Sequence, residues 1–144
     1  MTQTRAGALA ALETVIRTAM EAGGKACYRN PETSVDASHE GVVIMTDGVP
    51  GEPEPILSPR RYSWDHSVEF EITASGPERE ATVEAIIRLF EPALDLDRTL
   101  GGAVDYAAID TAPDIAEYEV EGAETERSAV LHVTLSYVTA SGAG

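Results

Sequence analysis

The sequence is poor in the residues that mark disulfide-rich, membrane-spanning or nucleic-acid-binding proteins. Its single cysteine, Cys27, excludes an intramolecular disulfide and is typical of a protein made in a reducing compartment. The longest apolar runs are only a few residues, so no segment is expected to cross a membrane. Ten Lys and Arg residues against 25 Asp and Glu residues give a net charge of -15. This balance disfavours non-specific binding to DNA or to anionic membranes, because both require positive charge.

Residues that could carry chemistry are also few. The three histidines, His39, His66 and His132, lack the spacing of metal ligands, and one cysteine provides no thiolate pair. Asp65, His66 and Ser67 include the residue types of a nucleophilic triad, but neighbours on a strand point to opposite faces. We therefore expect His66 to be a core or cross-strand histidine. We expect no catalytic residue, no cofactor and no metal site.

The stretch 60–73 gives the strongest secondary-structure signal in the chain. Taken in steps of two, it separates into an apolar set and a polar set. The apolar set is Tyr62, Trp64, His66, Val68, Phe70 and Ile72, and the polar set is Ser63, Asp65, Ser67, Glu69, Glu71 and Thr73. Side chains alternate between the two faces of a strand, so this pattern predicts a long strand with one buried and one acidic, exposed face. We interpret it as the central strand of an antiparallel sheet.

Helical and extended patterns share the rest of the chain. Apolar spacing predicts helices over 5–21 and from a start at 75–78 to Leu94, and strands are predicted over 41–46, 103–110, 114–121 and 129–138. In 114–121, Ala116, Tyr118 and Val120 should share one face and Glu117, Glu119 and Glu121 the other. Residues 25–40 are predicted to form turns. The segment 47–59 has four prolines and two glycines and is expected to be a projecting hairpin tip that is neither strand nor helix.

These elements predict one α+β domain over residues 1–144. Their order is α-β-β-α-β-β-β. The expected architecture is a mostly antiparallel sheet of four to five strands, with two helices packed on one face.

The order of these segments also resembles a known family. The segment DRTLGG, Asp97–Gly102, and the closing LSYVT, Leu135–Thr139, are its most specific parts, together with the long strand YSWDHSVEFEI. The chain resembles, over nearly its whole length, the tail terminators of long-tailed phages and of gene transfer agents, of the minor tail protein U type.

This resemblance implies a structural role in a virion. Such proteins form a six-subunit ring that caps the head-proximal end of the tail tube, stops tail polymerisation and offers a joining surface to the head connector, while DNA passes through the lumen. The implied partners are further copies of the chain, the tail tube protein and the connector or stopper protein. The implied location is the virion tail or neck, after synthesis in the host cytoplasm.

Two groups of charged residues are candidates for these contacts. Candidates for the subunit or partner interface are Arg60, Arg61, Arg79, Arg98, Glu52 and Glu54. Candidates for an acidic lumen that repels phosphates are Glu69, Glu71, Glu117 and Glu119. Ordinary surface salt bridges and a solvated acidic face remain alternatives. At the level of function, the alternatives are a head-completion or connector protein of the neck, a small acidic ligand-binding module or enzyme, and an acidic mimic of DNA.

Overall fold

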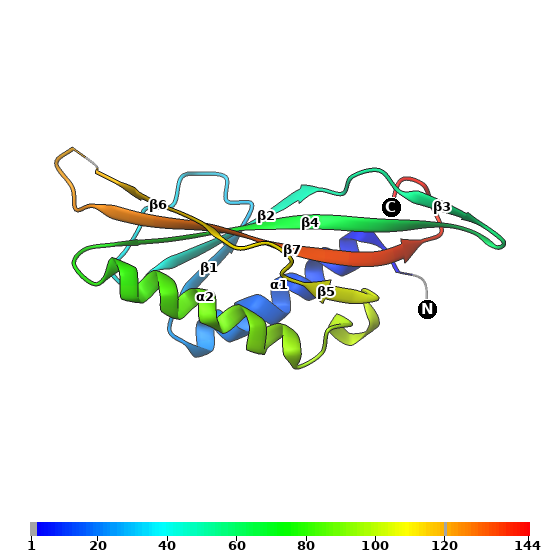
Figure 1. The fold of residues 1–144 in the computed structure, drawn as a ribbon, viewed down its shortest axis with the longest axis horizontal. Helices are drawn as coiled ribbons and strands as arrows, with labels where there is room; N and C mark the ends of the chain where they lie inside the picture. The colour runs from blue at the N-terminus through cyan, green and yellow to red at the C-terminus, as the bar shows by residue number, and fades with distance from the viewer. Residues whose placement is uncertain (1–2, 120) are drawn as a thin grey trace.

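A computed structural model describes residues 3–119 and 121–144, which contain two α-helices, one 3-10 helix and a seven-stranded sheet (Figure 1). In chain order the elements are α1 (Arg5–Ala22), β1 (Ala26–Arg29), β2 (Val42–Val49), β3 (Glu54–Leu57), β4 (Arg60–Ser75), α2 (Arg79–Asp95), the 3-10 helix η1 (Leu100–Gly102), β5 (Tyr106–Ala108), β6 (Asp114–Tyr118) and β7 (Glu126–Thr139). The α+β class is thereby confirmed. No helix in this part of the chain is long and apolar enough to cross a membrane.

The long strand predicted over 60–73 is the centre of the sheet. The strand order is β1-β2-β4-β7-β5, with β3 added to β4 and β6 added to β7. Only the β1–β2 pair is parallel, and the other pairs are antiparallel. The strands β4 and β7 pair continuously from Tyr62↔Thr139 to Ser75↔Glu126. The final strand β7 therefore lies inside the sheet, because it also pairs with β5 and β6 on its other side.

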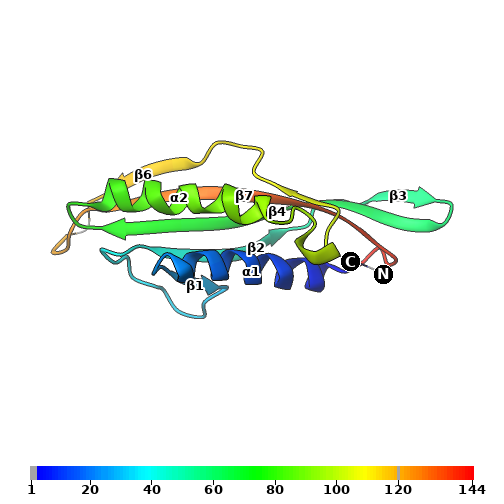
Figure 2. The same cartoon turned by 90° about the horizontal axis from the view of Figure 1, so that it is seen from below.

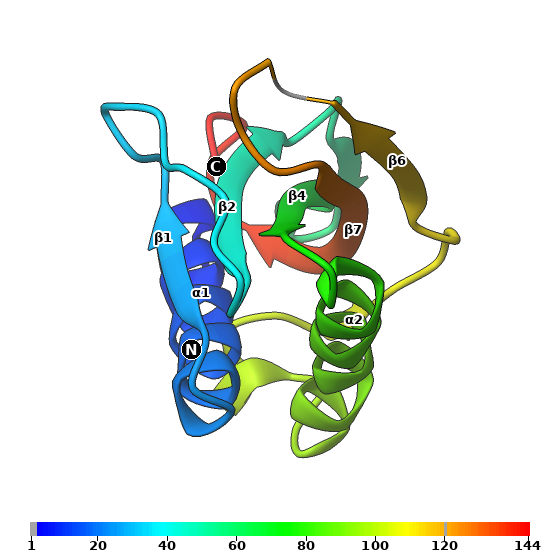
Figure 3. The same cartoon turned by 90° about the vertical axis from the view of Figure 1, so that its left-hand side faces the viewer.

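Both helices pack on one face of the sheet, as expected. Seen end-on in Figure 3, α1 lies beside β1 and β2, and α2 lies beneath β4 and β7. The alternate residues of β4 that face the helices, from Trp64 to Ile72, are at most 4% exposed. The ring of Phe70 meets that of Phe90 on α2 edge-on, with the centroids 5.1 Å apart, in the arrangement that aromatic pairs prefer. Neither α1 nor α2 covers the opposite side of the sheet, which we call the helix-free face.

The sheet has more strands than the predicted four to five, because two segments assigned to turns and loop are strands. β1 lies within the segment predicted as turns and pairs in parallel with β2. β3 lies within the Pro-rich segment 47–59, which was expected to exclude a strand. Pro55 is tolerated there because β3 is an edge strand, where a missing N–H need not interrupt a ladder. The flanking strands β2 and β4 do pair as a hairpin, which confirms that part of the prediction.

The strands predicted over 103–110 and 114–121 are shorter than expected. Residues 103–105 continue a turn in which the Val104 N–H donates to the Thr99 carbonyl, and only Tyr106–Ala108 pairs with β7. Strand β6 ends at Tyr118, and all five of its residues are exposed. Val120, predicted to continue one face of this strand, lies outside the described residues. The connection from α2 to β5 contains the 3-10 helix at Leu100, where the Asp97 carboxylate accepts from the Gly101 N–H at 2.9 Å.

Candidate functional site: an acidic sheet face and a projecting hairpin

The helix-free face carries a row of carboxylates from the central strand. Asp65, Glu69 and Glu71 occupy alternate positions of β4 on this face, and we call these three residues the acidic face. Their neighbours are uncharged or weakly basic: Thr46 of β2 lies beside Glu69, and His132 and Ser136 of β7 lie opposite Glu69 and Asp65. Within the paired segments 42–46, 63–73 and 128–138, this face presents no Lys or Arg.

The carboxylates of the acidic face are therefore only weakly compensated. The Ser136 hydroxyl donates to Asp65 Oδ1 at 2.9 Å, and His132 Nε2 lies 3.9 Å from Glu69 Oε1. A further acid, Asp110, accepts from the Thr134 hydroxyl at 3.2 Å above the same strands. Hydroxyl donors hold the carboxylates in place without cancelling their charge, so the face keeps a negative potential.

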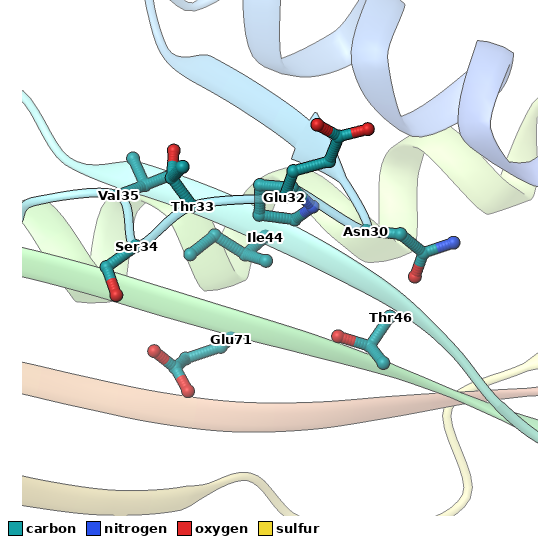
Figure 4. Close-up of a pocket in the computed structure, with 9 residues that line it drawn as sticks. Asn30, Glu32, Thr33, Ser34, Val35, Ile44, Thr46 and Glu71 are labelled. Atoms are coloured by element: carbon teal, nitrogen blue, oxygen red, sulfur yellow. The ribbon is translucent and has the colours of Figure 1, made fainter.

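A shallow depression of about 600 Å³ lies at one end of the acidic face. Figure 4 shows Ile44, Thr46 and Glu71 below the segment 30–35, which connects β1 to β2. The strands β1 and β2 are parallel and therefore need a crossover, and residues 30–35 of this connection lie over the helix-free face. The depression adds Glu32 to the acids at this end of the sheet and contains no basic side chain.

The second pair of predicted lumen residues lies elsewhere. Glu117 is opposite Arg127 and shares the side of the sheet that carries α2. Its carboxylate accepts from Arg79 at 3.1 Å and from Arg127 at 3.3 Å, and the Arg79 guanidinium holds the pKa of Glu117 below its usual range. Glu119 is exposed just beyond the end of β6. The structure thus brings Glu69 and Glu71 together and separates Glu117 from them.

A two-stranded hairpin projects from one end of the molecule. Residues 54–61, which we call the arm, extend past the last pair of β4 with β7, Tyr62↔Thr139 (Figure 2). Leu57 at its tip is 80% exposed and Ile56 is 44% exposed. The arm therefore presents apolar side chains to solvent, and no third strand of the described residues covers them, which is typical of a contact surface.

The predicted interface residues differ in what they contact. Arg60 lies over the Tyr62 ring, 5.8 Å from its centroid, and Arg61 donates to the Arg60 carbonyl at 3.0 Å. Neither makes a salt bridge within residues 3–119 and 121–144, and Glu52 and Glu54 at the base of the arm make none there either. All four side chains are exposed and free to meet another molecule.

The other two arginines are engaged within the chain. Arg79 binds Glu117 as described above, and Arg98 donates to Glu91 at 2.6 Å and to Asp95. The Glu91 carboxylate, with burial acting against it, raises the pKa of Arg98 above its ordinary value. For these two positions the structure favours the ordinary intramolecular salt bridge.

His66 is a core histidine, as predicted. It is 1% exposed, and its Nε2 lies 2.6 Å from the Asp47 carbonyl oxygen while its Nδ1 lies 2.9 Å from the Tyr137 hydroxyl. A carbonyl can only accept, so Nε2 carries the proton and Tyr137 donates to Nδ1. Burial lowers the pKa of His66, which favours this neutral form.

The sequence analysis missed a charged cluster around the side-chain carboxylate of Asp47, whose backbone carbonyl accepts from His66. The Arg29 guanidinium donates to both oxygens of Asp47, at 2.8 and 3.1 Å, and to Glu13 of α1 at 3.2 Å. The hydrogen bonds from Arg29 to Asp47 lower the pKa of Asp47, and the cluster ties β1, β2 and α1 together. The parallel pairing of β1 with β2 and the packing of α1 against β1 bring these residues together, and no spacing in the sequence indicates either. Cys27 on β1 is half-buried, and burial raises the pKa of its thiol.

Comparison with known proteins assigns no family. No protein-family model matches the chain, and no curated protein matches it. Within residues 3–119 and 121–144, no group of three or more His, Cys, Asp and Glu side chains is placed to hold a metal ion. The acidic face and the arm remain the two candidate functional surfaces of the described residues.

Proposed function

We propose that this chain is a structural virion protein, a tail terminator that forms a hexameric ring at the head-proximal end of a tail tube. In this role it stops tail polymerisation, provides the joining surface to the head connector and lets DNA pass through its lumen. Its partners are then further copies of itself, the tail tube protein and the connector or stopper protein. It acts in the virion after synthesis in the host cytoplasm, without catalysis or a cofactor.

The acidic face is the observation that carries this proposal. Asp65, Glu69 and Glu71 lie on a surface whose strands present no Lys or Arg over the paired segments 42–46, 63–73 and 128–138. Duplex DNA carries one negative charge per about 1.7 Å of its axis, and repulsion between exposed charges extends about 8 Å at physiological salt. A lumen lined by this face would repel phosphates, so that DNA could slide through without being bound.

The arm supports the ring-forming part of the proposal. A closed ring requires a heterologous interface, in which two different surfaces of the same chain meet. The arm provides one such surface, because Leu57 is 80% exposed and the adjacent Arg60 and Arg61 have no acidic partner within the described residues. In a chain with a net charge of -15, a basic and apolar tip is complementary to much of the remaining surface.

Deletion of the gene from the particle-producing cell tests the function directly. Negative-stain microscopy of the resulting particles should show overlong tails without heads. Tails of normal length beside unjoined heads would instead make the chain a head-completion or connector protein of the neck. Unchanged particles would refute a virion role and leave a ligand-binding module, an enzyme or a DNA mimic as the function.

A charge reversal tests the acidic lumen separately. The double variant Glu69→Lys/Glu71→Lys should assemble but retain DNA, seen as a gel shift of assembled rings and as reduced DNA transfer. The matched control is Glu80→Lys/Glu84→Lys, which makes the same change in charge on α2, away from the acidic face. Equal DNA retention by both variants would mean that net charge, and not the position of the acidic face, governs DNA passage.

A further inference from the structure

Four strands of the sheet have a neighbour on one side only, namely β1, β3, β5 and β6. On β1, Arg17 of α1 donates to the Cys27 carbonyl at 3.4 Å. On β5, Arg98 donates to the Ala107 carbonyl at 3.1 Å. Within the described residues, no side chain hydrogen-bonds to the backbone of β3 or β6. Strands β3 and β6 therefore keep open edges, and an open edge is a template for pairing with another strand.

Both open edges carry exposed apolar side chains. On β3, Leu57 is 80% exposed and Ile56 is 44% exposed. On β6, Tyr118 is 54% exposed and Ile115 is 43% exposed. The two strands also match in length, since β3 has four residues and β6 has five. Pairing of the two edges would remove part of this apolar surface from water, which is favourable.

The charges at the two edges are opposite. Arg60 and Arg61 follow β3 at the tip of the arm and have no acidic partner within the described residues. Asp114 is the first residue of β6, Asp110 lies just before that strand, and both are exposed. Neither makes a salt bridge within the part of the chain that the structure describes. The basic tip beside β3 is therefore complementary to the acidic beginning of β6.

We propose that β3 of one copy pairs antiparallel with β6 of a second copy, in the register that sets Leu57 opposite Ile115. These two side chains lie on the helix side of their own sheets, so each face of one sheet continues into the same face of the next. On the helix-free side, Ile56 then lies opposite Ala116. The result is one sheet that runs from copy to copy through the arm.

The charges also favour the antiparallel direction. In this direction the arginines of the tip lie at the Asp114 end of β6. In the parallel direction, the alignment that keeps Ile56 opposite Ala116 would place Glu54 directly opposite Asp114. Like charges directly opposite each other on neighbouring strands are destabilising. The antiparallel register therefore replaces a repulsive pair of carboxylates by an attractive contact between the tip and β6.

The positions of the two edges explain why they belong to different copies. The arm and β6 lie toward opposite ends of the long axis of the molecule (Figure 1). A contact between β3 of one copy and β6 of the next joins two different surfaces, so it is heterologous and can be repeated around a ring. The choice of a second copy as the partner rests on the ring-forming function proposed above, which this pairing would make specific.

Disulfide trapping between two single-cysteine proteins tests the pairing. In a Cys27→Ser background, one protein carries Leu57→Cys and the other Ile115→Cys, and the two are mixed in equal amounts and oxidised. Directly opposite residues of an antiparallel pair have Cα atoms about 4.5–5.5 Å apart, which is within the range of a disulfide. We expect a heterodimer share well above the half that random pairing gives. A share at or below one half would overturn the proposal.

The matched control moves the second cysteine by one residue. Ala116→Cys is also exposed on β6 but points to the other face of the strand, so it should form heterodimers with Leu57→Cys several-fold more slowly than Ile115→Cys does. Equal rates for the two positions would indicate collision without strand pairing and would overturn the proposed register.

A charge exchange tests the complementarity of the two edges. Arg60→Glu and Arg61→Glu in the Leu57→Cys protein should lower the initial rate of heterodimer formation about tenfold. Asp110→Lys and Asp114→Lys in the Ile115→Cys protein should restore most of this rate, because the attraction is then reversed in sign on both sides. A loss that the second change does not restore would refute the contact between the tip and the beginning of β6.

A final experiment separates the pairing from the proposed function. Leu57→Asp and Ile115→Asp each change an exposed side chain, so each should leave the chain folded and, in particles, reproduce the overlong tails of the gene deletion. Overlong tails in the deletion but normal tails with both variants would refute the pairing and leave the terminator function standing. Efficient heterodimer trapping with unchanged particles in the deletion would do the reverse. Overlong tails with Leu57→Asp alone would refute β6 as the partner and assign the arm to another virion protein.

Discussion

The hydrogen bond between His66 and Tyr137 gives the sharpest test of the core beneath the acidic face. Both residues are 1% exposed, and the Tyr137 hydroxyl donates to His66 Nδ1 over 2.9 Å. Tyr137→Phe removes this donor and leaves the ring in place, so its stacking on Trp64, with centroids 6.4 Å apart, is kept. The variant therefore isolates the hydroxyl.

The expected loss follows from what the variant leaves behind. His66 Nε2 must still donate to the Asp47 carbonyl, so Nδ1 remains a buried acceptor without a partner. Such a group costs about 1–3 kcal/mol, compared with about 1 kcal/mol for the net worth of an average hydrogen bond. We expect Tyr137→Phe to lower the free energy of unfolding by about 1–3 kcal/mol.

Urea unfolding at pH 7.5 measures this loss, provided that the dependence on denaturant is unchanged. The control is Tyr106→Phe, because Tyr106 is 52% exposed at the edge strand β5, and its loss should stay within about 0.5 kcal/mol. In a His66→Leu background the effect of Tyr137→Phe should shrink by about 1 kcal/mol or more, because the acceptor is absent. Equal losses for the two tyrosine variants, or no coupling to His66, would refute this account of the buried pair.

Three further predictions concern pH and the backbone. Burial lowers the pKa of His66 below its ordinary 6.5, so as pH falls below 6.5 the unfolded chain takes up the proton before the folded chain does. The free energy of unfolding of the unaltered protein should therefore drop between pH 7 and 5.5 by more than that of His66→Gln. Arg79 lowers the pKa of Glu117, so Glu117→Gln should have a lower free energy of unfolding than the unaltered protein at pH 7. This difference should vanish as pH falls from 4.5 through the lowered pKa. A difference that stays constant with pH would contradict the pairing of Glu117 with Arg79. Gly48 has φ 71°, and a Cβ there would lie 2.2 Å from the Ser67 carbonyl oxygen of β4. Gly24 also has a positive φ but has open space around it, so Gly24→Ala should lower the free energy of unfolding by about 1–2 kcal/mol. Thermal unfolding should therefore show a far larger loss of stability for Gly48→Ala than for Gly24→Ala.

Local periodicity predicted the main helices and strands correctly, because the side on which each side chain lies depends only on its place along the helix or strand. The alternation through β4 identified the buried residues from Trp64 to Ile72, and helical spacing located α1 and α2 to within a few residues. The segments that were missed, β1 and β3, are four residues each and lie beside turn signals or prolines. Short strands of this kind are stabilised by pairing with another strand, and the composition of the short segment does not indicate that partner.

The candidate site shows the same division. The sequence alone determined that Glu69 and Glu71 share one side of a strand, because side chains alternate along it whatever the strand pairs with. It also determined the acidic balance and offered Arg60 and Arg61 as candidates for an interface, but only the structure placed these two arginines at the end of a hairpin. Only the tertiary structure decided that Glu117 turns to the helix side, where Arg79 and Arg127 neutralise it. Such choices depend on strand register and helix placement over long sequence separations, where hydrogen-bonded pairing and burial act together and no local pattern specifies the partner.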